Sequence, residues 1–121
     1  METKKELEKK ANKLWSQIVL KHGNAPCFIN SNHGRAKHPH HFVFRSRSLA
    51  LKFDTRNGIP LCVKCHFAIH RRQDAVIQGV IALKKGQKWL DYIQEKKKIK
   101  VTKSKRWLQE QIEILEKEES L

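Results

Sequence analysis

The sequence predicts an α+β domain in which a short, histidine-rich pair of strands is flanked by helices. Apolar residues recur at helical spacing near both ends of the chain, and between them lie turn-forming residues and short runs rich in Phe, Val and Ile. At 121 residues the chain has the length of one domain, so we expect residues 1–121 to fold as a single unit.

The N-terminal section, residues 1–23, is predicted to be a helix. Its apolar residues recur every three or four positions within residues 3–21, and Gly23 suits the helix end. The recurring residues are Leu7, Ala11, Leu14, Trp15 and Ile18. Core packing is the expected role of Trp15. Residues 24–39 have the composition of a loop.

The middle of the chain is predicted to contain two short strands and a helix. His41 to Arg45 is rich in Phe and Val, which indicates a first strand, and residues 59–61 a second. Asn57-Gly58 between them is a strong hairpin signal. Residues 65–72 contain no helix breaker and should be helical.

The C-terminal section, residues 73–121, is predicted to be helical throughout. Residues 74–84 and 86–97 indicate one or two helices interrupted near Gly86, and residues 104–119 a last one. The apolar face of the last helix comprises Trp107, Leu108, Ile112 and Leu115.

Charge indicates an anionic partner. Lys and Arg number 26 against 12 Asp and Glu, a formal net charge of +14, which points to a polyanion, most simply nucleic acid. No run of 18 apolar residues predicts a membrane span, and no helix joins a wide apolar face to a purely basic one. Three cysteines, two of them in Cys-x-x-Cys, fit a reducing compartment, so we expect an intracellular, cytoplasmic protein.

Histidines dominate the chemistry-bearing residues. His66 and His70 are four apart and would share a helix face, where they can chelate one ion, although a chance surface pair has the same spacing. His40 and His41 are adjacent, so on a strand they point to opposite faces. A solvated, histidine-rich loop is the alternative explanation for this pair. Asn57 needs no chemical role if it is the first residue of an Asn-Gly turn.

The order and spacing of these residues resemble the HNH, or His-Me finger, endonucleases. Residues 57–66, NGIPLCVKCH, fit the family segment N-x-x-x-L-C-x-x-C-H, and a His pair precedes them as in the family. His70 makes the chain similar to the nuclease colicins, where two helix histidines and a strand histidine hold the metal. The resemblance covers about residues 27–72 and extends to small phage-encoded HNH proteins. It implies a ββα-metal core within residues 24–72.

The resemblance implies a role for each of these residues. His41 would be the general base that takes a proton from the attacking water, and Asn57 would hold the loop in register. His40, His66 and His70 would bind one catalytic divalent metal. Imidazoles favour Mn, Zn or Ni over Mg, yet members of the family are often assayed with Mg or Mn, so the metal is left open among these four.

The cysteines predict a structural zinc. Cys62-x-x-Cys65 resembles half of a zinc knuckle, and many relatives carry a second Cys-x-x-Cys upstream, where this chain has only Cys27. Three thiolates need a fourth ligand, and His33 or His38 would complete a Cys₃His site. Buried thiols that merely pack as small hydrophobes are the alternative.

Basic residues surround the predicted site in sequence. Arg offers bidentate contacts to phosphate, and binding through such residues should weaken with salt. The expected DNA contacts are Arg35, Lys37, Arg45, Arg47, Arg56, Arg71 and Arg72, with Lys52 among them in sequence. A further run (Lys96 to Lys98, Lys100, Lys103, Lys105 and Arg106) either follows backbone phosphates or is a solvated junction between helices.

Together these features predict a metal-dependent DNA endonuclease that nicks one strand per active site. Cutting both strands would need two sites, for example in a homodimer, for which Trp89 and Trp107 could supply apolar surface if they are not core residues. One alternative is a non-enzymatic, zinc-stapled DNA-binding module. The other is a nuclease subunit that is active only with a phage packaging or recombination partner.

Overall fold

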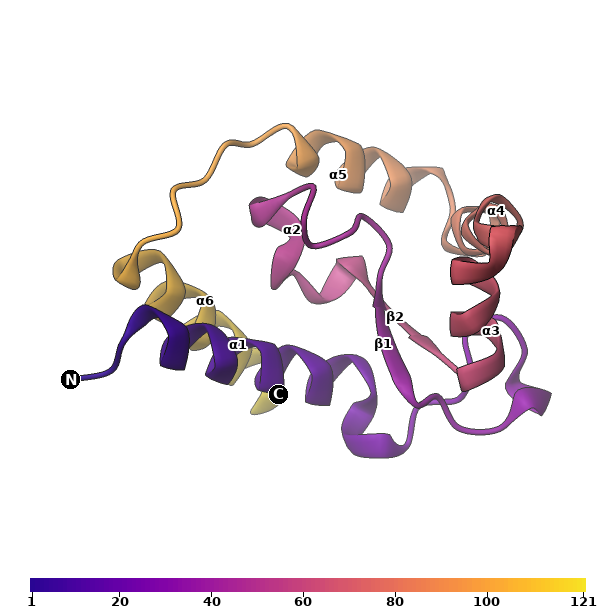
Figure 1. The fold of residues 1–121 in the computed structure, drawn as a ribbon, viewed down its shortest axis with the longest axis horizontal. Coiled ribbons are helices and arrows are strands. Elements are labelled where there is room, and N and C mark those ends of the chain that lie inside the picture. The colour runs from indigo at the N-terminus through magenta and orange to yellow at the C-terminus, as the bar shows by residue number, and fades with distance from the viewer.

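The computed structural model describes the chain from Met1 to Leu121 except for the side chain of Arg72. In these residues, helices surround a small antiparallel sheet, which confirms the predicted α+β class (Figure 1). No described helix has the length and apolar composition needed to cross a membrane. The elements are α1 (Lys4–Val19), β1 (His38–His41), α2 (Leu49–Lys52), β2 (Gly58–Leu61), α3 (Val63–Ala68), α4 (Asp74–Lys85), α5 (Gln87–Lys97) and α6 (Lys105–Glu119).

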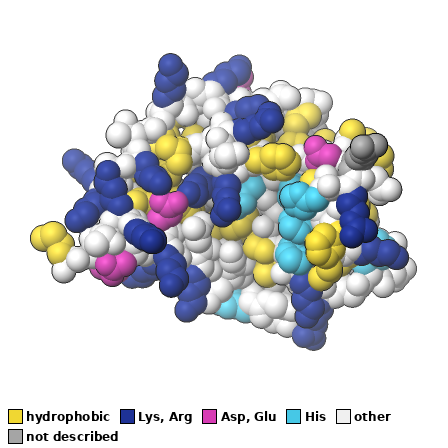
Figure 2. Space-filling view, in the orientation of Figure 1, with side chains coloured by type: hydrophobic (Ala, Val, Ile, Leu, Met, Phe, Trp, Pro, Cys, Tyr) yellow, Lys and Arg dark blue, Asp and Glu magenta, His cyan; other side chains and the backbone are white. Residues whose placement is uncertain are grey.

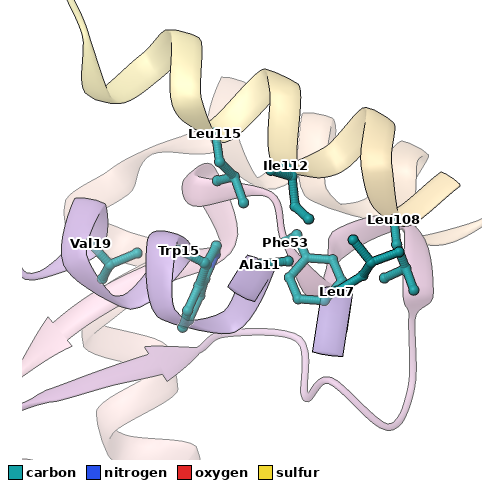
Figure 3. Close-up of a cluster of buried hydrophobic side chains, with 8 residues drawn as sticks. All are labelled: Leu7, Ala11, Trp15, Val19, Phe53, Leu108, Ile112 and Leu115. Atoms are coloured by element: carbon teal, nitrogen blue, oxygen red, sulfur yellow. The ribbon is translucent and has the colours of Figure 1, made fainter. Parts of the chain in front are cut away.

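Helices α1 and α6 lie side by side although they come from opposite ends of the chain (Figure 1). Each starts at a side-chain cap: Thr3 and Glu6 form a capping box before α1, and Ser104 accepts a hydrogen bond from the Trp107 N–H before α6. Their apolar faces meet in a buried cluster, as both periodicities predicted (Figure 3). The cluster comprises Leu7, Ala11, Trp15, Val19, Phe53, Leu108, Ile112 and Leu115.

A second buried cluster joins the sheet to α3 and α4. It contains apolar residues of β2, the cysteines and one face of the helices, with Trp89 of α5 packed against it. Its members are Cys27, Ile59, Leu61, Cys62, Cys65, Ile69, Ile77 and Ile81. The sheet therefore lies between two separate cores.

The first strand differs from its prediction. It spans His38–His41 rather than His41 to Arg45, and it pairs with β2 so that His38 faces Leu61 and His41 faces Gly58. The Phe and Val residues that indicated a strand instead begin the connection, residues 42–57. Of their side chains, the Phe42 ring packs edge-on against Trp89, whereas Phe44 is exposed at the surface and lies edge-on to His40.

Asn57-Gly58 is not a hairpin turn, contrary to its prediction. Gly58 has φ −96° and ψ 127°, which is extended backbone, whereas a type I′ turn needs positive φ. The glycine is required for another reason. A Cβ there would lie 2.2 Å from Val19 Cγ2 and 2.9 Å from Trp15 Cζ2, so only glycine lets α1 approach β2 this closely.

The predicted helix over residues 65–72 is helical but not uniform. Helix α3 starts at Val63, and a π-helical segment (Ile69–Gln73) joins it to α4. Cys62 caps α3, because its sulfur accepts a hydrogen bond from the Cys65 N–H. The predicted interruption at Gly86 is confirmed, with φ 94° between α4 and α5.

Two ion-pair groups fasten the outer segments. Glu8 of α1 accepts from Lys52 at 2.6 Å and from Lys103 at 2.7 Å, so Lys52 is a buried structural cation rather than a free phosphate contact. Asp54 accepts from Lys96 at 2.6 Å and from the Tyr92 hydroxyl. These bonds connect the loop before β2 to α5 and the N-terminal helix to the chain before α6.

Replacing Gly58 by Ala should destabilise the fold. We expect a loss of about 1–3 kcal/mol in the free energy of unfolding, because the new methyl group overlaps Val19 and Trp15. Gly79→Ala is the matched control: a Cβ there meets nothing within 4 Å, and alanine in α4 should add roughly 0.5–1 kcal/mol. Urea unfolding of both variants measures the difference. Equal effects would contradict the close approach at Gly58.

Replacing Glu8 by Gln should weaken the fold in a pH-dependent way. The hydrogen bonds from Lys103 and Lys52 lower the pKa of Glu8 to about 2. A carboxyl with a lowered pKa stabilises above its unfolded value, near 4.5, and the contribution is lost as the pH falls toward 2. We expect wild type to exceed the variant by about 1–2 kcal/mol at pH 7 and to match it near pH 2. A constant gap in unfolding experiments across this range would contradict the assignment.

Candidate functional site

The predicted catalytic histidines gather around one pocket of about 680 Å³. Figure 2 shows histidine side chains grouped on one face of the molecule, with Lys and Arg around them. Residues of β1, the following loop, α3 and one face of α1 line the pocket. They include His40, His41, His66, His70, Trp15, Asn12, Ser16, Phe44, Arg45 and Ser46.

His41 is held in one orientation at the end of β1. Its Nε2 lies 2.9 Å from the carbonyl oxygen of Lys52, and because a carbonyl only accepts, Nε2 carries the proton. Nδ1 is therefore the basic nitrogen. The ring stacks on Trp15 with centroids 3.9 Å apart. Burial lowers the pKa of His41 to about 4, so the imidazole is neutral at pH 7 and able to accept a proton.

Asn57 closes the loop that carries the Lys52 carbonyl. Its Oδ1 accepts from the Val43 N–H at 2.8 Å, and its Nδ2 donates to the carbonyl oxygens of Val43 and Leu51 at 2.9 and 3.3 Å. The residue is fully buried. Asn57 therefore joins the two ends of the connection between β1 and β2, which a turn residue would not do.

His40 is also fixed by a partner. Its Nε2 lies 2.9 Å from Gln78 Oε1, while the Gln78 amide donates to the Phe42 carbonyl at 2.8 Å. The amide oxygen therefore faces His40, which leaves Nδ1 as the free donor atom for a metal. Burial lowers the pKa of His40, although the Gln78 hydrogen bond and the Asp74 carboxylate act in the opposite direction.

The remaining histidines lie close together but do not converge on one point. Ring centroids are 6.1 Å apart for His40 and His66 and 5.0 Å for His66 and His70. Among the described residues, His40, His66 and His70 do not form a group whose donor atoms all lie within 4.8 Å. Holding one ion would require at least one imidazole to rotate. Burial, with neighbouring imidazoles, lowers the pKa of His66 to about 4.

The cysteine cluster, in contrast, fits a metal ion. The donor atoms of Cys27, His33, Cys62 and Cys65 all lie within 4.8 Å of one another. Tetrahedral zinc places two sulfurs about 3.8 Å apart and a sulfur and a nitrogen about 3.6 Å apart. The observed separations are 3.8 Å for the sulfurs of Cys27 and Cys65, and 3.4 and 3.7 Å from His33 Nδ1 to Cys65 and Cys62. The four ligands form a closed site, which is typical of structural zinc.

The histidine that gathers with the three sulfurs is His33 rather than His38. His33 sits in a short turn after Cys27, whereas His38 begins β1 and stacks on His66 with ring centroids 4.5 Å apart. His38 lies five positions after His33 and is not among the residues whose donor atoms gather with the sulfurs. The sequence offered both histidines, and the structure selects the one in the loop.

The thiols are unequal before any metal binds. Burial raises the pKa of Cys65 to about 12. Burial also acts to raise the pKa of Cys27, but backbone N–H groups and His33 donate to its sulfur and lower the value to about 6. Hydrogen bonds to the sulfurs therefore favour a thiolate within this group, which is the form that binds a cation.

The predicted DNA contacts lie at different places on the surface. Arg45 lines the histidine pocket, and Arg47 lies in the neighbouring cavities. Arg56 stacks over Tyr92 and Arg71 over Phe67, whereas the Arg72 prediction concerns a side chain outside the described residues. The exposed members of the predicted set are Arg35, Lys37, Arg45, Arg47, Arg56 and Arg71.

Two residues of the site were not predicted from the sequence. Gln78 orients His40 from α4, and Trp15 stacks on His41 from α1 in addition to its core role. Asp74 also lies near His40, and within the described part of the chain its buried Oδ1 has no hydrogen-bond partner. Helical periodicity marks which face of a helix is buried, but not which strand that face meets.

No protein-family model, no curated protein and no solved structure matches the chain. The assignment of a function therefore rests on the residues and their geometry. Two features carry it: a histidine pocket with one oriented base, and a separate Cys₃His group that fits zinc.

The purified protein should contain one zinc ion per chain, and His33→Ala should lose it while His38→Ala keeps it. The reason is that only His33 lies within reach of the three sulfurs. Cobalt substitution followed by absorption spectroscopy reports the ligands, since thiolate-to-cobalt bands and tetrahedral d–d bands depend on the donor set. Loss of the metal in His38→Ala with retention in His33→Ala would overturn the assignment.

Proposed function

We propose that the chain is a DNA endonuclease of the HNH type, which hydrolyses phosphodiester bonds and nicks one strand per active site. The observation that carries the proposal is His41: a neutral imidazole with a fixed Nε2–H donor, in a pocket beside three other imidazoles. A binding surface has no need of a base held in one tautomer. The arrangement of elements supports the same proposal, because β1 and β2 pair antiparallel across a connection that contains α2, and α3 follows β2 directly.

His41 would act as the general base. Nδ1 takes a proton from water, the water oxygen forms a bond to phosphorus, and the bond from phosphorus to the 3′-oxygen breaks; the 3′-oxygen leaves with the bonding electron pair and takes a proton from solvent. The Lys52 carbonyl stabilises the imidazolium that forms, because it already accepts from Nε2. Arg45 at the rim of the pocket would hold the scissile phosphate.

A divalent cation would neutralise charge on the phosphate and the leaving oxygen. Its ligands would come from His40, His66 and His70, of which His40 has its Nδ1 free. The donor atoms of these three histidines do not meet in one group in the described structure, so at least one imidazole would have to rotate to hold the cation. Which of Mn, Zn, Ni or Mg supports cleavage is decided by adding each back.

A zinc-stapled DNA-binding module remains the second candidate. The observation in its favour is that the Cys₃His group satisfies metal geometry while the histidine pocket does not. In this alternative His41 would serve only to pack against Trp15. The orientation of His40 and His41 by separate hydrogen bonds favours the nuclease.

The test is cleavage of supercoiled plasmid by zinc-loaded protein with Mg, Mn, Ni or additional Zn. Wild type should convert the plasmid to open circles with at least one metal, and His41→Ala should be slower by about 10²–10⁴-fold because the base is lost. His22→Ala is the matched control, since His22 is exposed, pairs with Glu119 and does not line the pocket. His22→Ala should retain wild-type activity.

The outcomes separate the candidates. Equal rates for wild type and His41→Ala would show that His41 is not the base. Absence of cleavage with every metal, together with salt-sensitive DNA binding, would favour the binding module. Cleavage that appears only after a phage packaging or recombination protein is added would instead identify a partner-dependent subunit.

A further inference from the structure

A second cavity of about 680 Å³ lies between the loop after β1 and the chain that leaves α5. We call it the basic groove. One wall consists of residues 45–49, and the other of residues 97–101, where the long connection between α5 and α6 begins (Figure 1). Its lining residues with cationic side chains are Arg45, Arg47, Lys97, Lys98 and Lys100.

The basic groove adjoins the histidine pocket. Arg45 and Ser46 line both cavities, so the two share a boundary at these residues. A chain that occupies the histidine pocket next to His41 can therefore continue past Arg45 into the groove. The groove would therefore lie along the path of a linear substrate that leaves the histidine pocket.

The charges of the groove are uncompensated. None of its lining residues is acidic. Within the described residues, Arg45, Arg47, Lys97 and Lys100 form no salt bridge, and Lys98 pairs only with the exposed Glu95, which is a weak interaction. Lys96 differs, because Asp54 holds it in the neighbouring cavity. Among the lysines from position 96 to position 100, Lys96 is therefore structural, whereas Lys97, Lys98 and Lys100 line the groove.

We propose that the basic groove binds the phosphodiester backbone of the strand whose scissile phosphate lies at His41. The proposal rests on the proposed nuclease function, and it assigns to residues 97–100 a positioning role. Two serines, Ser46 and Ser48, line the groove between the cations. Cationic and hydroxyl groups without base-reading side chains hold a phosphate backbone and carry no sequence information.

The test removes three charges from the groove and compares the result with three charges removed elsewhere. The groove variant is Lys97→Gln, Lys98→Gln and Lys100→Gln together. The control is Lys10→Gln, Lys13→Gln and Lys117→Gln, three exposed lysines that form no salt bridge in the described structure and line neither the histidine pocket nor the basic groove. Both variants lose three positive charges, so a difference in DNA binding between them depends on where the lysines lie and not on net charge.

Binding of a labelled DNA strand is measured by fluorescence anisotropy from low to high salt. Both variants are made in the His41→Ala background, without added divalent metal, so that no cleavage occurs. If the groove variant loses three contacts to phosphate, the slope of log K for binding of the DNA strand against log salt concentration should become smaller in magnitude by about 2. The control should change the slope by less than about 1. An RNA strand of the same sequence provides a second arm.

A reduced slope with DNA in the groove variant alone supports the proposal. Equal slopes in the two variants would overturn it, because binding would then follow net charge only. A reduction with RNA but not with DNA would also overturn it.

In otherwise wild-type protein, the groove variant should raise KM for plasmid by about tenfold with little change in kcat. The two proposals can fail separately. If the groove variant changes binding but no protein cleaves plasmid, the nuclease proposal is wrong. If plasmid is cleaved but the two variants have equal salt slopes, the groove proposal is wrong.

Discussion

The buried side chain of Asn57 is the constraint on which the site depends. Its amide bonds three backbone groups, two at the start of the loop after β1 and one in α2. The carbonyl that orients His41 belongs to the residue after Leu51, so the position of the base is set through this amide. An apolar residue of similar size would leave these backbone groups unpaired in the interior, where each costs about 1–3 kcal/mol.

The histidine pocket forms where two small cores meet. Trp15 belongs to the cluster between α1 and α6, yet it stacks on His41 and donates to the Asp54 carbonyl at 3.0 Å. Gly58 allows this contact, because α1 rests directly on the backbone of β2. On the other side, Gln78 of α4 reaches His40 from the second cluster. Relative movement of the cores would therefore separate the base from the neighbouring imidazoles.

Local patterns predicted much of this arrangement, and long-range packing explains the rest. The periodicities of α1 and α6 located both helices, and the cysteine spacing identified three ligands of the Cys₃His group. Asn57-Gly58 was recognised as important but interpreted as a turn, because a dipeptide does not reveal that its glycine faces Val19. The strand over His41 to Arg45 was misplaced for a similar reason: Phe and Val favour strands, but here the two Phe rings lie edge-on to Trp89 and His40. Gln78 carries no sequence signal, since its partner is 38 residues away.

The Cys₃His group and the histidine pocket both include residues of α3. Cys62 caps this helix and Cys65 lies in its first turns, so a cation at the sulfurs fixes where the helix begins. His66 follows Cys65 immediately but faces the pocket rather than the sulfurs. A chain with two small cores has little apolar burial to hold so short a helix, and metal binding contributes folding free energy directly. Zinc at this group would thus order the histidines without touching substrate, and its loss would abolish the site by releasing α3.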